Sequence, residues 1–233
     1  MSGSAYQTRR GELLEYFDRT AAEAWSRLTS DAPVSRIRAT VRAGREEMRR
    51  TLLDWLPADL SGVRLLDAGC GTGALAIAAA QRGADVTAVD LSPRLVALAR
   101  ERTPSALGSG RVEFRVGDML DPELGAFTYT VAMDSLIHYR ASDARRVLAG
   151  LAARSRRGVL FTFAPRTPAL AAMHALGRMF PRRERAPAIE PIAERSMRTG
   201  LAADPALAGW RAARAARINR GFYISQAMEL VRS

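Results

Sequence analysis

The stretch that most constrains this 233-residue chain runs from Val63 to Gly73 and reads VRLLDAGCGTG. A short apolar run meets a carboxylate, Asp67, and then three glycines at alternate positions before a helical pattern begins. Glycine takes a positive φ without steric cost and lets the backbone approach a ligand closely. The pattern therefore predicts a buried strand followed by a nucleotide-cofactor turn, which belongs to an α/β fold.

The spacing of Gly69, Gly71 and Gly73 indicates which ligand such a turn holds. The dinucleotide fingerprint is G-x-G-x-x-G, with pyrophosphate at the helix N-terminus, whereas here the third glycine comes one residue early. A carboxylate just before the turn suits the ammonium of a methionyl group better than a pyrophosphate. The stretch resembles motif I of the class I, Rossmann-like methyltransferases and favours S-adenosylmethionine over NAD. The alternative is a purely structural glycine turn.

Three further strand patterns, DVTAVD, VEFRVGD and FTYTVAMD, end at Asp90, Asp118 and Asp134. Asp90 follows the turn by about 20 residues, where such folds hold ribose hydroxyls. Asp118 lies in a Gly-Asp-Met sequence that resembles the adenine-contacting loop of methyltransferases. Ligands of open α/β sheets bind at the carboxyl ends of the strands. We therefore expect cofactor contacts from Asp67, Gly69, Gly71, Gly73, Asp90, Leu91, Asp118, Met119 and Asp134.

The remaining patterns complete a Rossmann-like class I methyltransferase fold, with a seven-stranded, mostly parallel sheet and helices on both faces. GVLFTF at 158–163 is the fifth strand, and its apolar run indicates burial on both sides. Segments 210–219 and 221–230 resemble the antiparallel pair that closes this fold. The first of the two is rich in alanine and is equally compatible with a helix.

Two segments extend the sheet domain, which spans residues 61–233. Residues 1–60 hold two helical patterns, at 11–28 and about 35–56. In class I methyltransferases such extensions often fold over the cofactor, so we expect an N-terminal helical lid. The stretch at about 165–201 is too long for an ordinary connection. We expect it to be an insertion that covers the substrate site.

Composition limits the location and the partners of the chain. No window approaches the ~18 to 20 apolar residues of a membrane span, and the amino terminus lacks the apolar stretch of a signal peptide. We expect a cytoplasmic protein that is at most peripheral to a membrane. Residues 154–233 carry 15 arginines against 5 acids, a net charge of +10. A basic third of this kind suits nucleic acid, an anionic membrane or an acidic small molecule.

The residues after the fourth and fifth strands exclude several methyl acceptors. MDSLIHY stands where enzymes that methylate DNA amino groups usually carry an Asn/Asp-Pro-Pro-Tyr/Phe tetrapeptide. Pyrimidine C5 methylation needs a nucleophilic cysteine, and the single Cys70 lies in the glycine turn. Residues 162–165, TFAP, lack the ligands of metal-assisted catechol methylation. What remains is metal-independent transfer to a small-molecule oxygen or nitrogen, with no metal bound by the protein.

A closer resemblance covers nearly the whole chain. YFDRTAAEAW, VAMDSLIHY, FTFAPRTPAL and GFYISQAMEL are similar to stretches of the magnesium protoporphyrin IX O-methyltransferases of bacteriochlorophyll synthesis. The resemblance implies methyl transfer from S-adenosylmethionine to one propionate of magnesium protoporphyrin IX, giving the monomethyl ester and S-adenosylhomocysteine. Magnesium then enters only with the substrate. A further option is that the arginine-rich insertion docks to a partner that delivers the porphyrin, for which the resemblance suggests the large subunit of magnesium chelatase.

Two rival functions stay open from the sequence. One is methylation of a quinone precursor or another small aromatic acceptor, for which the lid and the sheet would look alike. The other is a basic RNA-binding module, whose binding would weaken steeply with salt. Sequence-specific RNA readers usually carry aromatic stacking platforms, whereas most aromatic residues of the basic third lie in apolar patterns. We therefore expect no nucleic-acid partner.

The chemistry of carboxylate methylation indicates what the side chains must do. A propionate has an ordinary pKa of about 4.3, so the nucleophile is already ionised and positioning is the main task. A bidentate arginine on the reacting carboxylate would stabilise the ground state, so we expect weaker donors there, His138 and Tyr16. The alternative for His138 is a loop histidine that is hydrogen-bonded to the backbone. The alternative for Tyr16 is packing in the core.

Arginines are expected to hold the second propionate, and the insertion is expected to line the pigment. A helical pattern with flexible methionines beside arginines suits a large, flat, partly apolar ligand with negative groups. His174 is also a candidate axial ligand of the porphyrin magnesium, although magnesium prefers oxygen. The predicted substrate contacts are Arg166, Met173, His174, Met179, Arg182 and Arg183, with Arg178 and Arg185 as further candidates for the propionate.

Overall fold

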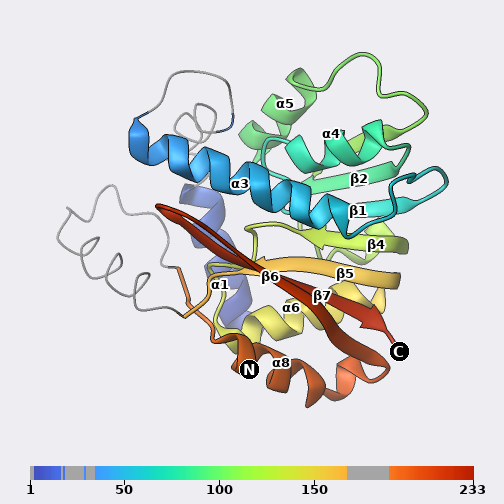
Figure 1. The fold of residues 1–233 in the computed structure, drawn as a ribbon. Helices are drawn as coiled ribbons and strands as arrows, with labels where there is room; N and C mark the ends of the chain where they lie inside the picture. The colour runs from blue at the N-terminus through green and yellow to red at the C-terminus, as the bar shows by residue number, and fades with distance from the viewer. Residues whose placement is uncertain (1–2, 17, 19–28, 30–34, 167–188) are drawn as a thin grey trace.

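The computed structural model describes residues 3–16, 18, 29, 35–166 and 189–233. Its centre is a seven-stranded sheet in the order β3-β2-β1-β4-β5-β7-β6 (Figure 1). β1 to β5 are parallel, whereas β7 runs antiparallel to both β5 and β6. The strands are β1 (Arg64–Ala68), β2 (Asp85–Asp90), β3 (Arg111–Val116), β4 (Phe127–Ala132), β5 (Ser155–Phe163), β6 (Trp210–Arg220) and β7 (Tyr223–Arg232). The predicted mostly parallel methyltransferase sheet is confirmed.

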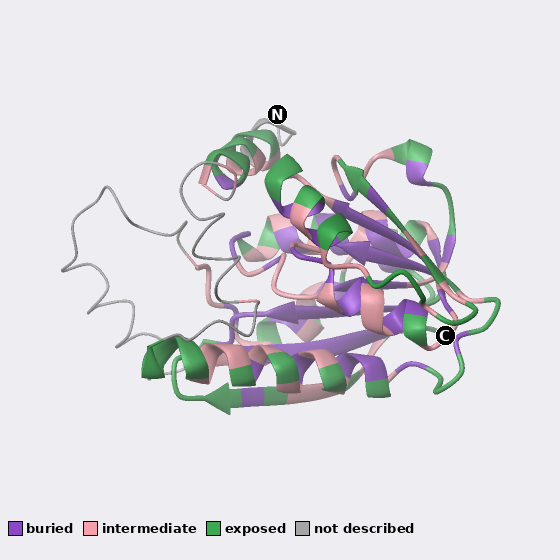
Figure 2. Ribbon diagram, turned by 90° about the horizontal axis from the view of Figure 1, so that it is seen from above, coloured by how far each residue is buried: buried purple, intermediate pink, exposed green. Residues whose placement is uncertain are grey.

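Helices cover both faces of the sheet, as predicted (Figure 1). On one side lie α3 (Arg36–Asp54), α4 (Ala74–Gln81) and α5 (Pro93–Glu101), and on the other α1 (Gly3–Glu15), α6 (Ala141–Ala153) and α8 (Glu194–Ala202). Neighbouring strand residues alternate between two core clusters: Leu65 packs toward α3 and α4, and Leu66 packs toward α6. Figure 2 shows the buried residues concentrated along the strands and on the inward sides of the helices.

Local sequence signals account for several element boundaries. Ser92 caps α5 by accepting a hydrogen bond from the Leu95 N–H, and Pro93 occupies the first helical position. Two short 3-10 helices, Pro122–Leu124 and Pro205–Leu207, likewise begin at a proline after an aspartate cap. In these three helices a polar cap residue followed by proline marks the start of the helix.

The alanine-rich segment that was compatible with a helix is a strand, β6. Its pairing with β7 along most of its length fixes an extended backbone, so tertiary pairing overrides alanine's helix propensity. β6 is one of the two edge strands of the sheet, and it carries four exposed arginines, Arg211, Arg214, Arg217 and Arg220. Charged side chains on an edge strand oppose pairing with another chain.

The two N-terminal helices differ in role. Met48 and Leu52 of α3 are 0% exposed, so α3 is part of the core of the sheet domain and residue 60 marks no break in packing. α1 begins at Gly3, eight residues before the predicted start. The prediction missed residues 3–10 because they are polar and carry no apolar stripe that periodicity would detect. Residues 17 and 19–28 of the predicted helix lie outside the described residues. The opening of a lid stays a prediction.

The insertion after β5 returns to the sheet before its predicted end. Pro165 and Ile192 form a parallel bridge, and the Ile192 N–H donates to the Ala164 carbonyl at 2.8 Å. α8 then packs against α6 and β6 as an ordinary helix of the domain. Residues 167–188 lie outside the described residues. No helix in the described part of the chain is both long and apolar enough to span a membrane.

Candidate active site

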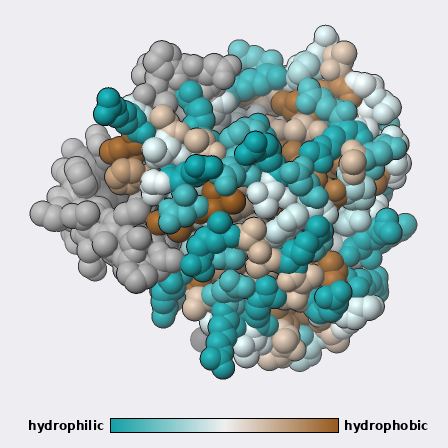
Figure 3. All heavy atoms as spheres, viewed as in Figure 1, coloured by the Kyte–Doolittle hydropathy of each residue, from teal (hydrophilic) through white to brown (hydrophobic). Residues whose placement is uncertain are grey.

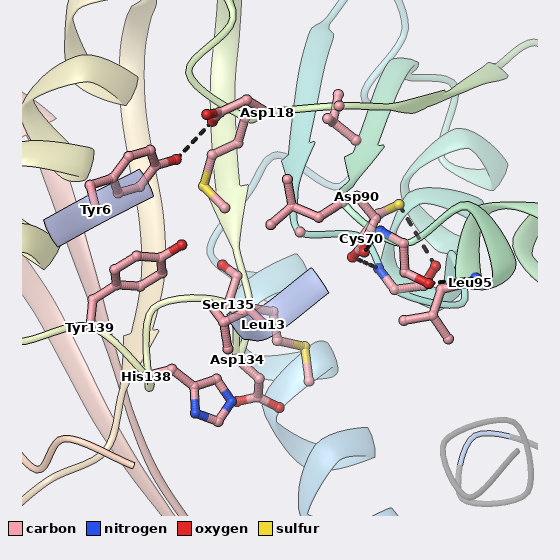
Figure 4. A pocket seen from close by; sticks show the side chains of 18 of the residues that line it. Tyr6, Leu13, Cys70, Asp90, Leu95, Asp118, Asp134, Ser135, His138 and Tyr139 are labelled. Atoms are coloured by element: carbon pink, nitrogen blue, oxygen red, sulfur yellow. Dashed lines mark hydrogen bonds between the residues drawn. The ribbon is translucent and has the colours of Figure 1, made fainter. Parts of the chain in front are cut away.

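A cavity lies at the carboxyl ends of the parallel strands, between the glycine turn and α1 (Figure 4). It is the site that the strand-end rule for open α/β sheets predicts. Seven of the nine predicted cofactor residues line it, namely Gly69, Gly71, Asp90, Leu91, Asp118, Met119 and Asp134. Asp67 lines a second cavity that shares Gly69 and Cys70 with the first, and Gly73 caps α4.

The glycine turn has the geometry that its sequence requires. Gly69, Gly71 and Gly73 have φ values of 83°, 54° and 79°, all in the left-handed region that glycine favours. A Cβ added to Gly69 would lie 2.5 Å from the Cβ of Ser135, and one on Gly73 would lie 2.9 Å from the Phe114 ring. Gly69 and Gly73 therefore cannot carry a larger side chain without displacing Ser135 or Phe114, which pack against the turn.

Asp90 links the turn to the next helix. Its Oδ2 accepts a hydrogen bond from the Gly71 N–H at 2.8 Å, and its Oδ1 accepts one from the Ser92 N–H at 2.9 Å. Burial raises the pKa of Asp90, although these two bonds act in the opposite direction. Asp90 also lines the cavity. The predicted ribose contact stays a prediction, and this geometry is compatible with it.

Asp67 is a buried carboxylate with an unsatisfied oxygen. It is 1% exposed, and its Oδ2 has no hydrogen-bond partner within the described part of the chain. Burial, followed by the negative charge of Asp90, raises the pKa of Asp67 to about 7. A buried carboxylate of this kind is stabilised by a cation that reaches it. The residues present thus fit the ammonium group of a methionyl ligand.

Arginines of α3 face the same second cavity. Arg42, Arg45 and Arg49 line it together with Asp67 and Thr72. Their i, i+3, i+7 spacing places them on one face of α3. Cations and a carboxylate in one cavity match the two charges of an amino-acid group. These arginines were not predicted as site residues, although their helical spacing just before the glycine turn is a signal that could have identified them.

α1 contacts the acid that was predicted to meet adenine. The Tyr6 hydroxyl donates to Asp118 Oδ1 at 2.7 Å, and Arg10 forms an ion pair with Asp118 Oδ2 at 3.1 Å. The Tyr6 ring stacks on Tyr139 with centroids 5.6 Å apart. Burial raises the pKa of Tyr139 to about 12 and also raises the pKa of Tyr6, so both hydroxyls stay protonated as donors. Tyr6 and Tyr139 were not predicted as site residues.

The structure places His138 in the cavity but not Tyr16. His138 is 6% exposed and lines the cavity beside Ser135 and Tyr139 (Figure 4). Tyr16 is half-buried after the end of α1, burial raises its pKa, and it is absent from the cavity wall. The cavity wall receives Tyr6 from this helix instead. Their roles in catalysis stay predictions.

The predicted substrate residues fall into two groups. Arg166 is exposed just beyond β5, and its backbone N–H donates to the Ile192 carbonyl at 3.1 Å. The others, Met173, His174, Met179, Arg182 and Arg183, and the candidates Arg178 and Arg185, lie outside the described residues. Their part in holding the pigment therefore stays a prediction.

Asp134, a predicted cofactor contact, has several partners within the protein, and its role toward the cofactor stays a prediction. Its carboxylate forms an ion pair with Arg45 at 2.5 Å and accepts a hydrogen bond from the Tyr223 hydroxyl at 2.9 Å. Its φ is 55°, the single positive value outside glycine among the described residues. Although Asp134 lines the cavity, protein groups already hold its oxygens.

The sheet order, the glycine turn and the acids at successive strand ends define a class I methyltransferase that uses S-adenosylmethionine. Residues 132–232 match the family model of the magnesium-protoporphyrin IX methyltransferase C-terminus, and residues 65–158 match a methyltransferase domain model. The chain is 48% identical to the magnesium-protoporphyrin O-methyltransferase of Rhodobacter capsulatus, over 97% of this chain and 98% of that protein. It belongs to the magnesium-protoporphyrin O-methyltransferase family.

Other relatives agree with this assignment. The magnesium-protoporphyrin O-methyltransferase of Synechocystis is 30% identical over 94% of both chains. A crystal structure of magnesium protoporphyrin IX methyltransferase from Synechocystis with bound SAH matches with a TM-score of 0.84 and 29% identity, covering 96% of this chain and 100% of that one. A ubiquinone biosynthesis O-methyltransferase of Xanthomonas oryzae is 35% identical, but over only 54% of each chain.

Proposed function

We propose that this chain transfers the methyl group of S-adenosylmethionine to a propionate carboxylate of magnesium protoporphyrin IX, forming the monomethyl ester and S-adenosylhomocysteine. The 48% identity to the Rhodobacter capsulatus protein carries the proposal, because it extends over 97% of the chain and includes the acceptor side. The likeness to the quinone-pathway enzyme stops at 54% of the chain, which disfavours that alternative. Magnesium belongs to the substrate in this proposal.

The donor would be held along the two connected cavities. The sulfonium donor supplies the methyl group. Asp67 takes the donor ammonium on its unsatisfied oxygen, and Arg42 and Arg45 face the donor carboxylate. Asp90 accepts from the ribose hydroxyls. The remaining predicted contacts lie further along the cavity, where Leu91, Met119 and Asp118 bind the adenine.

The acceptor side needs no general base. The propionate is ionised near neutral pH, so the chain has to orient one carboxylate oxygen toward the donor and keep water away. His138 donates a hydrogen bond to the reacting carboxylate, and Met119 and Met133 supply apolar wall. Cation and anion cancel as the methyl group moves, so a water-poor site favours transfer. Tyr16 stays a candidate second donor, and Arg166 a candidate partner of the other propionate.

We further propose a docking partner for the basic surface. β6 carries four exposed arginines, and the face of the molecule on which Figure 1 shows β6 has many hydrophilic side chains (Figure 3). The family resemblance implies the large subunit of magnesium chelatase, and an anionic membrane is the second candidate. Binding to either should weaken with salt. Arg211→Glu should weaken cosedimentation of the protein with the chelatase subunit or with anionic vesicles. Arg50→Glu, the same charge reversal at an exposed position of α3, should leave cosedimentation unchanged.

One assay tests the proposed substrate directly. The protein is incubated with methyl-labelled donor and, separately, magnesium protoporphyrin, metal-free protoporphyrin, a catechol quinone precursor and bulk RNA. The label should enter magnesium protoporphyrin at least tenfold faster than any other acceptor. Faster labelling of the quinone precursor or of RNA would refute the proposal.

A further inference from the structure

Asp134 lies where the backbone leaves β4 for the segment that carries His138. Its φ of 55° lies in the left-handed region, which Asp and Asn enter more readily than other non-glycine residues, and neighbouring groups hold it there. These groups come from three elements outside β4. Arg45 of α3 and Tyr223 of β7 bind the carboxylate, and the Thr162 hydroxyl of β5 lies 2.7 Å from the Asp134 backbone nitrogen.

Tyr223 reaches Asp134 from the far hairpin because α3 makes room for it. Gly44 is buried in α3, and a Cβ at this position would lie 2.5 Å from Tyr223 Cδ1. The hairpin is also fixed at its tip, where the Phe222 N–H donates to the Thr40 hydroxyl at 3.3 Å. The glycine in the interior of α3 thus has a packing reason.

The contacts of Asp134 connect two parts of the cavity wall, one at Arg45 and one at His138. Arg45 lines the two cavities where they meet, and His138 stands four residues beyond Asp134 on the same segment. Tyr223 touches neither cavity. Its hydroxyl nevertheless lies 2.9 Å from Asp134 Oδ1, with the Ser225 hydroxyl a weaker neighbour at 3.5 Å. A small shift of a reacting group can cost a large factor in rate.

We propose that Tyr223 is a positioning residue for methyl transfer: together with Arg45 it holds the Asp134 carboxylate, and so fixes the segment that presents His138 to the acceptor. The inference rests on the proposed function for its kinetic part. The inference gives the antiparallel β6–β7 hairpin a part in the chemistry at the carboxyl ends of the parallel strands. Tyr223 is not itself a donor contact, and the ion pair of Arg45 with Asp134 does not depend on the Tyr223 hydroxyl. Its effect should therefore fall on turnover and spare donor binding.

Tyr223→Phe tests this, because it keeps the ring against Gly44 and removes only the hydroxyl. We expect kcat with magnesium protoporphyrin to fall about tenfold or more, with S-adenosylhomocysteine affinity within twofold of wild type. Tyr129→Phe makes the same change on β4 beside Gly158 and should leave kcat within twofold. Asp134→Asn tolerates the left-handed backbone, and its effect should be non-additive with Tyr223→Phe.

A second readout does not depend on the substrate. In the complex with S-adenosylhomocysteine, amide hydrogen exchange of residues 134–139 should be at least tenfold faster in Tyr223→Phe and unchanged in Tyr129→Phe. Unchanged exchange and kcat within twofold of wild type in Tyr223→Phe would overturn the inference. A parallel loss of turnover and donor affinity would also overturn it, because it would indicate a general loss of structure in the site. Wild-type protein that fails to methylate magnesium protoporphyrin would refute the proposed function, and the exchange result would still decide this inference.

Discussion

Asp67→Asn separates the role of this carboxylate in folding from its role in binding the donor. The pKa of Asp67 is raised from 3.8 to about 7 in the folded chain. The folded state therefore holds a proton more tightly than the unfolded state, and stability falls as pH rises from about 4 to about 7. A difference of about 3 units corresponds to about 4 kcal/mol above pH 7. Asparagine cannot ionise and escapes this cost.

The variant should thus be more stable than wild type at pH 8, by about 2 to 4 kcal/mol, and similar to wild type at pH 4. Urea unfolding without donor at the two pH values measures this. Asp54→Asn, the same change at a side chain that is 68% exposed, should show no such gain at pH 8. A loss of stability in Asp67→Asn at pH 8 would refute the reasoning.

Donor binding should move in the opposite direction. A hydrogen bond to a charged group contributes about 1.5 to 3 kcal/mol, so Asp67→Asn should weaken S-adenosylhomocysteine binding about 10- to 150-fold. In wild type the ammonium favours the ionised carboxylate, so binding at pH 6 should release a proton. With a pKa of about 7 the affinity should then be about tenfold lower at pH 6 than at pH 8. Calorimetry measures the affinity, and repeating it in two buffers of different ionisation enthalpy measures the proton release. Equal affinity of wild type and variant would contradict the assignment.

Three further substitutions test other parts of the site. Gly69→Ala should abolish measurable donor binding because its Cβ would meet Ser135 at 2.5 Å, whereas Gly62→Ala, also at positive φ but in open space, should cost only about 1 to 2 kcal/mol of stability. His138→Ala should lower kcat at least tenfold and leave donor affinity within twofold, and equal losses of both would remove it from the acceptor side. Tyr6→Phe should weaken donor affinity several-fold and speed proteolysis of α1, since the hydroxyl bond to Asp118 is lost. Unchanged proteolysis would show that this bond does not anchor α1.

Much of the fold was readable because its signals are local. The glycine turn, the strand ends at Asp90 and Asp118 and the cap at Ser92 all follow from residues close in the sequence. The presence of Asp90 and Asp118 in the cavity was also predictable, because parallel strands bring their carboxyl ends to one edge of the sheet.

What the sequence did not reveal depends on contacts between distant segments. Asp134 meets Arg45 and Tyr223 at a separation of 89 residues on either side, and no periodicity reports such a network. Tyr6 lies in a polar helix without an apolar stripe, so its stacking on Tyr139 gave no signal either. These contacts between distant segments exist only in the folded chain.

The most direct test of the account asks which atom receives the methyl group. Magnesium protoporphyrin is labelled with methyl-labelled donor and wild-type protein, and the purified product is treated with alkali. Because a carboxylate ester hydrolyses, the account predicts that the label leaves as methanol and that unmodified pigment is recovered. Label that stays on the pigment after hydrolysis, or absence of labelled pigment, would contradict it.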